Sequence, residues 1–273
     1  MHESSVFWLR VAAVLYSLGL LHSLYSLFAR RAHLLRPALT AFVAAVTLHL
    51  VSLVELTQAE GHPPIANFYQ TISLCAFLFA LVFLYVWWRY QFVPLSVFLF
   101  PIIFVMTLVG AMEMPVAGWS TPRLREGWLL THILSVLSGY AALLLTAGAS
   151  FFYLIRERQL KRKSPVALMD RLPPLGTLDS LITRSLSFAF VLLTLGMITG
   201  LTWAFIESGT RWVGDARIHV AMITWALCLG GVFLRNMAGW RGRRAAMLSL
   251  ALVGCAAVTW AAHVGLRSVL LQK

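Results

Sequence analysis

Residues 185–206 read SLSFAFVLLTLGMITGLTWAFI, a run of 22 residues without a charged side chain. At a rise of 1.5 Å per residue, a helix of about 20 residues crosses the roughly 30 Å hydrocarbon layer of a membrane. Seven further apolar runs lie on either side of it: 6–28, 38–57, 67–88, 92–112, 128–155, 217–235 and 245–266. The sequence therefore predicts an all-α, polytopic integral membrane protein, with about eight helices in one transmembrane domain over residues 1–273.

The composition excludes the other broad classes of protein. Hydrophobic residues make up 60% of the 273 residues, charged residues make up 12%, and the mean hydropathy is +0.81. An ordinary globular domain has about 25% charged residues, and a soluble chain of this size cannot bury so much apolar surface in one core. Disorder is excluded for the same reason.

The three cysteines, Cys75, Cys228 and Cys255, lie within apolar runs and are predicted to be small buried side chains. The chain has no CxxC and no CxxCH, so we expect neither a dithiol redox role nor covalent attachment of its own c-type haem. The start, MHESS, has no basic region, and the first apolar run is long enough to span the membrane. We therefore expect no cleavable signal peptide.

The net charge of +12 at pH 7 resembles that of a nucleic-acid-binding protein, but the positions of the cations argue against one. With the N-terminus outside, 15 of the 22 cations and only three acids fall on the inner side, which then carries the whole net charge. The positive-inside rule predicts both termini outside, in the bacterial inner (cytoplasmic) membrane. Contact with anionic lipid explains the basic loops, and no nucleic-acid partner is expected.

The longest loop, 156–184, is short and basic. Its stretch 164–184 is predicted to lie along the inner membrane surface, with Thr177 or Asp179 capping the helix that follows.

Histidines provide the candidate ligands, because polar groups within a membrane are costly and therefore candidates for function. From the predicted topology, His132, His219 and His263 gather near the outer ends of their helices, whereas His49 is deeper and His22 lies near the cytoplasmic end. Neutral imidazole is a good ligand for haem iron, and two histidines at one depth can hold a flat macrocycle between them. The alternative is that each histidine bonds a neighbouring helix or lies at the headgroup level.

Four tryptophans lie near the predicted outer interface: Trp119, Trp128, Trp203 and Trp212. A tryptophan belt is ordinary at a membrane surface. A porphyrin also needs aromatic walls, and it needs cations for its propionates, for which Arg211, Arg217, Arg123 and Arg125 are available. Asp215 follows Trp212 by three residues and can orient a ligand histidine through its second nitrogen.

Four stretches resemble the CcsA/HemX-type cytochrome c assembly proteins. GHPPIANFYQTI at 61–72 resembles the family's G-H-F-P-L-S-N-L-Y-E-S-L, and WLLTH at 128–132 resembles its W-L-x-x-H. LPPLGTLD at 172–179, followed by GMITGLTWA at 196–204, resembles L-P-x-L-x-x-L-D and G-x-x-x-G-x-x-W-A. GWRGRRAA at 239–246 is identical to the family's stretch. The resemblance covers about residues 55–265.

The outer segment at 203–220, which we name the WWD-like segment, departs from the family pattern W-G-x-x-W-x-W-D-P-K-E. Trp212 and Asp215 match, whereas Gly214 replaces a tryptophan, Ala216 the proline and Ile218 the glutamate. Phe233 stands where assembly members often carry a membrane histidine, and His263 is the equivalent of a histidine near the family's C-terminal end. These departures favour a HemX-like branch or a divergent haem-handling member.

The resemblance implies a haem-binding protein of cytochrome c biogenesis that holds or delivers haem at the outer face for attachment to apocytochrome c, with an outer-domain assembly partner protein. It implies a b-type, non-covalent haem with His132 and His263 as axial ligands, and with Trp203, Trp212 and Asp215 as further cofactor-binding residues. Any haem-lyase activity would be positioning chemistry, because haem supplies the reactivity. No motif of a protease, a P-loop or a nucleophilic serine is present, so no catalytic residue is predicted.

Two alternative functions remain open from the sequence. One is a HemX-like membrane regulator of tetrapyrrole synthesis that acts through a cytoplasmic partner. The other is a transporter or scaffold that keeps the fold but binds no haem. His49, His62 and His219 also remain as possible haem ligands.

Overall fold

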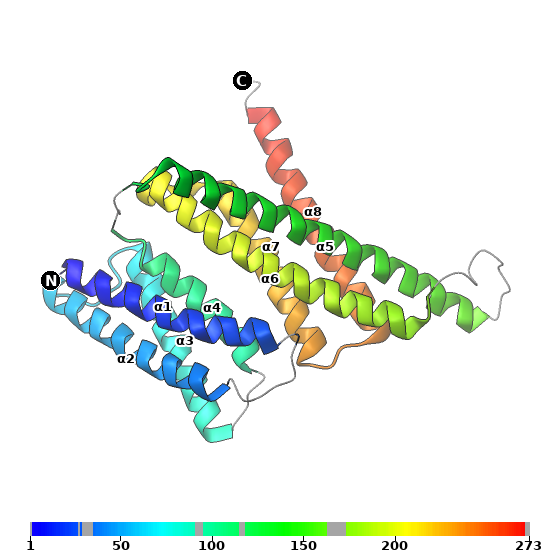
Figure 1. Cartoon of the computed structure of the whole chain (residues 1–273), viewed down its shortest axis with the longest axis horizontal. Coiled ribbons are helices and arrows are strands. Elements are labelled where there is room, and N and C mark those ends of the chain that lie inside the picture. The colour runs from blue at the N-terminus through cyan, green and yellow to red at the C-terminus, as the bar shows by residue number, and fades with distance from the viewer. Residues whose placement is uncertain are drawn as a thin grey trace. The chain divides into compact units, whose positions relative to one another are not determined.

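The computed structural model describes residues 2–26, 28, 35–90, 95–114, 118–162 and 173–270, with their side chains except at 2, 35, 162 and 259–270. Every regular element in these ranges is helical, which confirms the predicted all-α fold (Figure 1). The elements are α1 (His2–Ser26), α2 (Leu35–Glu60), α3 (Phe68–Tyr90), α4 (Leu95–Gly110), α5 (Pro122–Arg162), α6 (Leu175–Ser208), the 3-10 helix η3 (Gly209–Gly214), α7 (Ala216–Asn236) and α8 (Gly242–Leu270).

Each predicted span corresponds to one of these α-helices. Among the described residues, six helices are long and apolar enough to cross a membrane, namely α1, α2, α3, α5, α6 and α7, and α4 is a shorter apolar helix. The fold is therefore that of a multi-pass membrane protein, as predicted.

Two helices extend well beyond their predicted spans. α5 has 41 residues and α6 has 34, which at 1.5 Å per residue is about 60 Å and 50 Å of helix. Because the Pro174 carbonyl accepts the first helical bond from Leu178 N (3.1 Å), α6 begins directly after the two prolines. Thr177 and Asp179 lie inside this helix, so their predicted capping role is wrong. Residues 175–184 continue α6 instead of lying as a separate surface segment, and residues 163–172 lie outside the described residues.

The chain divides into two compact units, and one domain over residues 1–273 stays a prediction. Unit 1 comprises residues 1–118 and 204–211, and unit 2 comprises residues 119–203 and 212–273. Within unit 1, α1 packs on α2 and α4, and α3 packs on α4. Its centre is a group of aromatic rings whose centroids lie 4.6–5.2 Å apart: Tyr16, Phe42, Phe83 and Phe100.

Pro101 lies inside α4, where it removes one helical hydrogen bond. The carbonyl that loses its partner belongs to Val97, four residues earlier. Ser23 Oγ of α1 donates to Val97 O at 3.2 Å, and both residues are buried. An unsatisfied carbonyl within a membrane costs several kcal/mol, so the hydroxyl of α1 completes the hydrogen bonding of α4.

Within unit 2, α5 and α6 approach each other closely through glycines. A Cβ atom on Gly139 of α5 would lie 2.8 Å from Leu193 Cδ2, and one on Gly196 of α6 would lie 2.7 Å from Val136 Cγ2. Small residues allow membrane helices to pack with their backbones near each other. α8 packs on both α5 and α7 and completes this unit.

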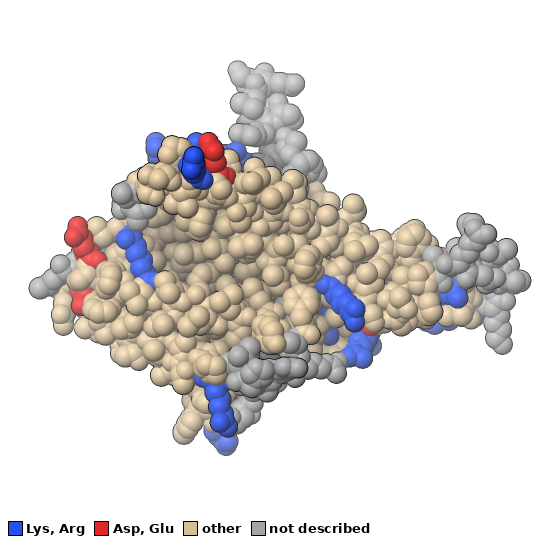
Figure 2. All heavy atoms as spheres, in the orientation of Figure 1, with Lys and Arg blue, Asp and Glu red and all other residues tan. Residues whose placement is uncertain are grey.

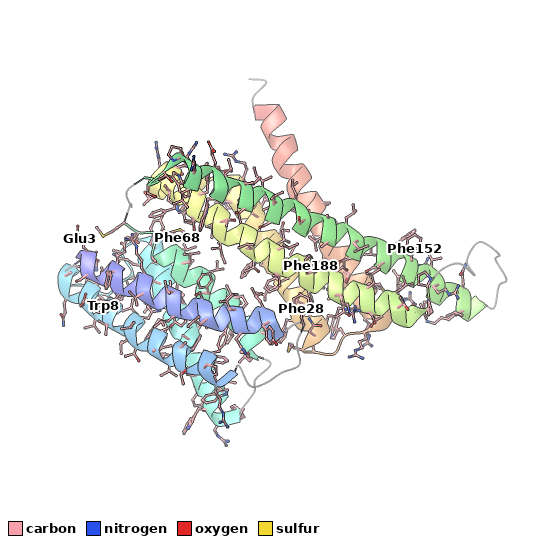
Figure 3. The ribbon with its side chains drawn as sticks, in the orientation of Figure 1. Glu3, Trp8, Phe28, Phe68, Phe152 and Phe188 are labelled. Carbon is pink, nitrogen blue, oxygen red and sulfur yellow. The ribbon has the colours of Figure 1, made fainter. Side chains whose placement is uncertain are left out.

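Exposed apolar side chains cover the described helices, as a lipid-facing surface requires. Phe152 of α5 and Phe188 of α6, 45% and 54% exposed, are examples (Figure 3). The face drawn in Figure 2 is mostly uncharged, with Lys, Arg, Asp and Glu confined to a few places. The predicted burial of the cysteines holds for Cys228 but not for half-buried Cys75 or exposed Cys255, since an apolar residue in a membrane protein can face lipid.

Candidate functional site

His132 lines a pocket between α5, α6 and α7 of unit 2, with a volume of about 190 Å3. From α5 the lining residues are His132, Val136 and Tyr140, whose spacing of four places them on one helix face. The walls from α6 and α7 are mainly apolar and include Trp225, and Arg217 is the charged side chain of the lining. The pocket thus combines one imidazole, apolar walls and one cation.

The imidazole of His132 is held by the backbone of α6. Its Nδ1 lies 2.9 Å from Gly196 O and 3.4 Å from Thr199 Oγ1. A carbonyl oxygen can only accept, so Nδ1 carries the proton, and in the neutral ring Nε2 carries the lone pair. Nε2 has no hydrogen-bond partner within the part of the chain that the structure describes, which leaves it available to a ligand.

Gly200 provides the space for this imidazole. A Cβ atom at this position would lie 2.6 Å from His132 Cε1 and 2.9 Å from Nδ1, closer than real Cβ contacts. Gly196 and Gly200, one helical turn apart on α6, therefore let the ring lie directly against the helix backbone.

A cluster of three indoles includes Trp128, one turn before His132 on α5. The Trp119 ring lies 5.4 Å from the Trp203 ring and 6.2 Å from the Trp128 ring. Trp128 Nε1 donates to Thr199 O at 2.9 Å, which ties the cluster to the same turn of α6 that holds His132. The guanidinium of Arg125 lies 4.9 Å from the centre of the Trp203 ring, a cation–π contact.

The WWD-like segment is ordered as the end of α6, the helix η3 and the first turn of α7. Trp212 is buried, 3% exposed, on η3. Asp215 is the N-cap of α7, because its Oδ1 accepts from Arg217 N at 2.9 Å. Its Oδ2 also pairs with Arg217 Nη2 at 2.7 Å, so Asp215 positions the pocket's arginine. A role for Asp215 in orienting a histidine stays a prediction.

The other histidines have different surroundings. The side chain of His263 lies outside the described residues, but its helix, α8, packs against α5, which carries His132. His22 and His49 are buried in unit 1, where His49 Nε2 lies 2.9 Å from Ser73 Oγ. His62 and His219 are exposed. Of these histidines, His132 is the one that lines the pocket.

Several residues of the site had no role assigned to them from the sequence. Gly196 and Gly200 entered only as matches to a motif, although their spacing of four is itself a signal for close helix packing. Trp225 donates from Nε1 to Thr194 Oγ1 at 3.0 Å, which fixes the indole in the pocket wall. No pattern in the sequence predicted that bond.

Comparison with known proteins places the chain in a family. The model of the family described as "Cytochrome C assembly protein" matches residues 8–271. The chain belongs to this family. It is 29% identical over 252 residues to the cytochrome c biogenesis protein CcsA of Prochlorococcus marinus strain MIT 9312, an alignment that covers 83% of this chain and 80% of that protein. It is 31% identical over 214 residues to CcsA of strain MIT 9515, covering 70% of this chain and 68% of that protein. No solved structure matches.

In this member of the cytochrome c assembly family, the stretch 61–72 forms a polar junction at the start of α3. Asn67 Oδ1 accepts from Gln70 N at 2.9 Å and caps the helix. The buried Gln70 amide donates from Nε2 to both carboxylates of the junction, Glu60 (3.0 Å) and Glu113 (3.0 Å).

The polar junction is also hydrogen-bonded to the WWD-like segment. Tyr69 OH donates to Thr210 O of η3 at 3.0 Å, across 141 positions of sequence. Both residues belong to unit 1. The hydrogen bond therefore anchors the start of η3, two residues before Trp212.

Proposed function

We propose that this membrane protein acts in cytochrome c biogenesis by holding a non-covalent, b-type haem at the outer face of the bacterial inner membrane, for attachment to apocytochrome c. The observation that carries the proposal is the geometry of His132. Its Nδ1 is fixed by Gly196 O, and its Nε2 remains free to bind within an apolar pocket.

The residues of the pocket fit the chemistry of haem. Hydrogen bonding of one ring nitrogen to a carbonyl fixes the tautomer and raises the basicity of the other nitrogen as a ligand. Apolar walls suit the porphyrin faces, and Arg217 suits a propionate. Haem, when bound, supplies the iron and the vinyl groups to which cysteine thiols add.

The pocket can accommodate only part of a haem. Its volume of about 190 Å3 is below the roughly 300–1,000 Å3 of pockets that enclose small molecules. His132 and its neighbours would therefore hold one part of the macrocycle and leave the rest to other residues. We assign that complementary role to His263 as second axial ligand and to Trp203, Trp212 and Asp215 in and around the WWD-like segment.

The named relatives favour this function over a HemX-like regulatory role, because they are CcsA proteins described as acting in cytochrome c biogenesis. The partners that we propose are haem, apocytochrome c and an assembly protein with an outer domain. This chain's own contribution is to ligate, orient and shield haem.

Histidine-to-glycine variants test the proposal. The protein purified after expression with ample haem is expected to give the low-spin spectrum of a six-coordinate, bis-histidine haem. His132→Gly and His263→Gly are each expected to give high-spin or labile haem, and added imidazole is expected to restore the low-spin spectrum by filling the vacated site. His219→Gly, at an exposed histidine, serves as the control and is expected to keep the wild-type spectrum.

If both glycine variants keep low-spin haem at full occupancy without imidazole, the ligand assignment is wrong. If the wild-type protein binds no haem in detergent or in membranes, the fold serves as a transporter or scaffold.

A further inference from the structure

The turn between α7 and α8 displays a group of arginines. We name residues 239–244, Gly-Trp-Arg-Gly-Arg-Arg, the arginine turn. Arg241, Arg243 and Arg244 are exposed, and Trp240 is 38% exposed. The turn needs the left-handed conformation twice, at Gly239 (φ 71°) and Gly242 (φ 67°), which glycine adopts at little cost.

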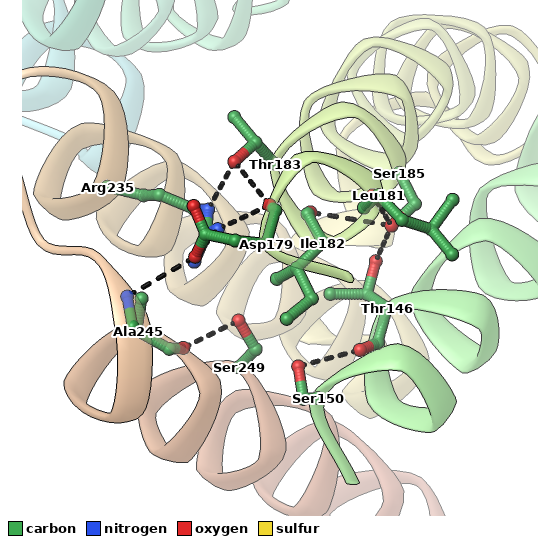
Figure 4. Close-up of polar contacts among 11 residues, drawn as sticks. Thr146, Ser150, Asp179, Leu181, Ile182, Thr183, Ser185, Arg235, Ala245 and Ser249 are labelled. Atoms are coloured by element: carbon green, nitrogen blue, oxygen red, sulfur yellow. Dashed lines mark hydrogen bonds and ion pairs between the residues drawn. The ribbon is translucent and has the colours of Figure 1, made fainter. Parts of the chain in front are cut away.

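An ion pair between buried Arg235 and half-buried Asp179 holds the arginine turn in place (Figure 4). Arg235 of α7 donates from Nη2 to Asp179 Oδ1 of α6 at 2.7 Å and from Nε to Thr183 Oγ1 at 2.7 Å. The same Asp179 oxygen accepts from Gly242 N, the first residue of α8, at 3.2 Å. Three helices of unit 2 therefore meet at one carboxylate, which joins Asp179 to Gly242, 63 positions apart in sequence.

Arg235, whose guanidinium lies beside the N-terminus of α8, has one donor that is unpaired within the described part of the chain. The residue is only 4% exposed, and its Nη1 is buried without a hydrogen-bond partner among the described residues. The guanidinium lies beside this helix end, because Nη2 and Gly242 N share one oxygen. A helix N-terminus carries partial positive charge and further unpaired N–H groups, so this point favours an anion.

No described acid neutralises the exposed arginines of the turn. The two acids described at this end of unit 2 are engaged elsewhere: Glu157 with Lys161 at 2.8 Å, and Asp179 with Arg235. Arg184, five residues after Asp179 on α6, is exposed as well and adds to the positive charge of this end of the helix. The arginine turn therefore carries net positive charge that a ligand can neutralise.

The depth of the arginine turn in the membrane indicates which kind of ligand it binds. α7 has 21 residues, about 32 Å, so it crosses the hydrocarbon layer once and its C-terminal end lies at headgroup depth. An exposed tryptophan beside arginines at this depth is typical of the lipid–water interface. Basic pockets between helices on the cytoplasmic side bind anionic headgroups.

We propose that the arginine turn is a binding site for the phosphate of an anionic phospholipid, formed by Arg241, Arg243 and Arg244 at the N-terminus of α8 and held in place by Asp179 and Arg235. Phosphate suits the planar, multiply donating guanidinium groups. The site does not depend on haem.

Thermal unfolding in nanodiscs tests the site. The wild-type protein is expected to melt several degrees higher in discs of phosphatidylcholine with about one third phosphatidylglycerol than in phosphatidylcholine alone, since a ligand that binds only the folded state stabilises it. The double variant Arg243→Gln/Arg244→Gln is expected to lose most of that shift. Arg158→Gln/Lys161→Gln removes the same charge from the end of α5 and is expected to keep it.

Equal loss of the shift in both double variants would mean diffuse surface attraction and would overturn the site. So would a full shift in the Arg243/Arg244 variant. Inorganic phosphate added to phosphatidylcholine discs separates the sources, because a shift of the same size would assign the site to a free anion instead of a lipid. If the double variant does not fold, the single variants Arg243→Gln and Arg244→Gln and the count of retained phosphatidylglycerol by native mass spectrometry decide the question.

Discussion

Gly200 has no Cβ atom, and the imidazole of His132 occupies the space that a Cβ would fill. In Gly200→Ala the new Cβ would lie 2.6 Å from Cε1 of the imidazole, so the ring must move and weaken its bond to Gly196 O. A hydrogen bond of this kind contributes about 1 kcal/mol, which corresponds to roughly fivefold weaker haem retention. We expect the haem spectrum to shift toward high spin although both proposed ligand histidines remain.

Gly148→Ala is the matched control, because Gly148 lies in α5 and a Cβ there would meet nothing within 4 Å. Alanine is favoured over glycine in a helix by up to about 1 kcal/mol, so this variant is expected to keep the spectrum and to melt at the same temperature or higher. A wild-type spectrum in Gly200→Ala would show that the imidazole does not depend on this contact.

Single residues differ in how far the sequence could reveal their roles. His132 was a candidate because it lies near the predicted outer end of an apolar run and matches the family motif, and its role as a haem ligand stays a prediction. The role of Gly200 depends on the register of α5 against α6 to within a fraction of an ångström, which no hydropathy pattern contains. The capping role of Asp215 was accessible, since an aspartate directly before a helix is a capping signal.

At the scale of elements, η3 is anchored by Tyr69 of α3. Tyr69→Phe removes the bond to Thr210 O and keeps the ring, which is only 9% exposed. Loss of about 1 kcal/mol should raise local opening of the segment about fivefold. We expect hydrogen exchange of the backbone amides of residues 211–215 to accelerate by that factor, and this can be measured without haem.

Tyr85→Phe is the control from the same helix, because Tyr85 is 57% exposed and its loss should not affect η3. Unchanged exchange at residues 211–215 in Tyr69→Phe would mean that other contacts hold the segment.

The elements themselves were largely predictable, and their ends were not. Hydropathy locates a helix where it is surrounded by lipid, and all eight spans follow from that. α5 and α6 continue beyond those spans as helices with polar residues such as Glu157 and Asp179. There the helix is stabilised by contacts with α7 and α8, including the Asp179 ion pair, which local sequence does not reveal.

At the scale of the whole molecule, the distribution of charge predicts that both termini face outward. A C-terminal fusion to a protein that fluoresces only in the cytoplasm should therefore be dark. The same reporter placed after residue 240, behind α7, should be bright. A bright full-length fusion would reverse the sidedness proposed for the haem site.

The proposed pairing of His132 with His263 as haem ligands also depends on the whole molecule. From the sequence the two residues share only a predicted depth. That α5 and α8 pack on each other is a fact of tertiary structure, which an order of spans along the chain does not specify. The division of the chain into two units was equally inaccessible, because apolar runs of both units look alike.

The hydrogen bond from Ser23 to the Val97 carbonyl has a consequence for biogenesis. α4 has 16 residues, or about 24 Å, and carries one carbonyl that its own backbone cannot satisfy, so alone it would leave the translocon as a poor membrane segment. The ribosome makes α1 some seventy residues earlier. Because α1 is synthesised first, Ser23 is available when α4 enters the bilayer. Its hydroxyl can then donate to the Val97 carbonyl that the backbone of α4 leaves without a partner.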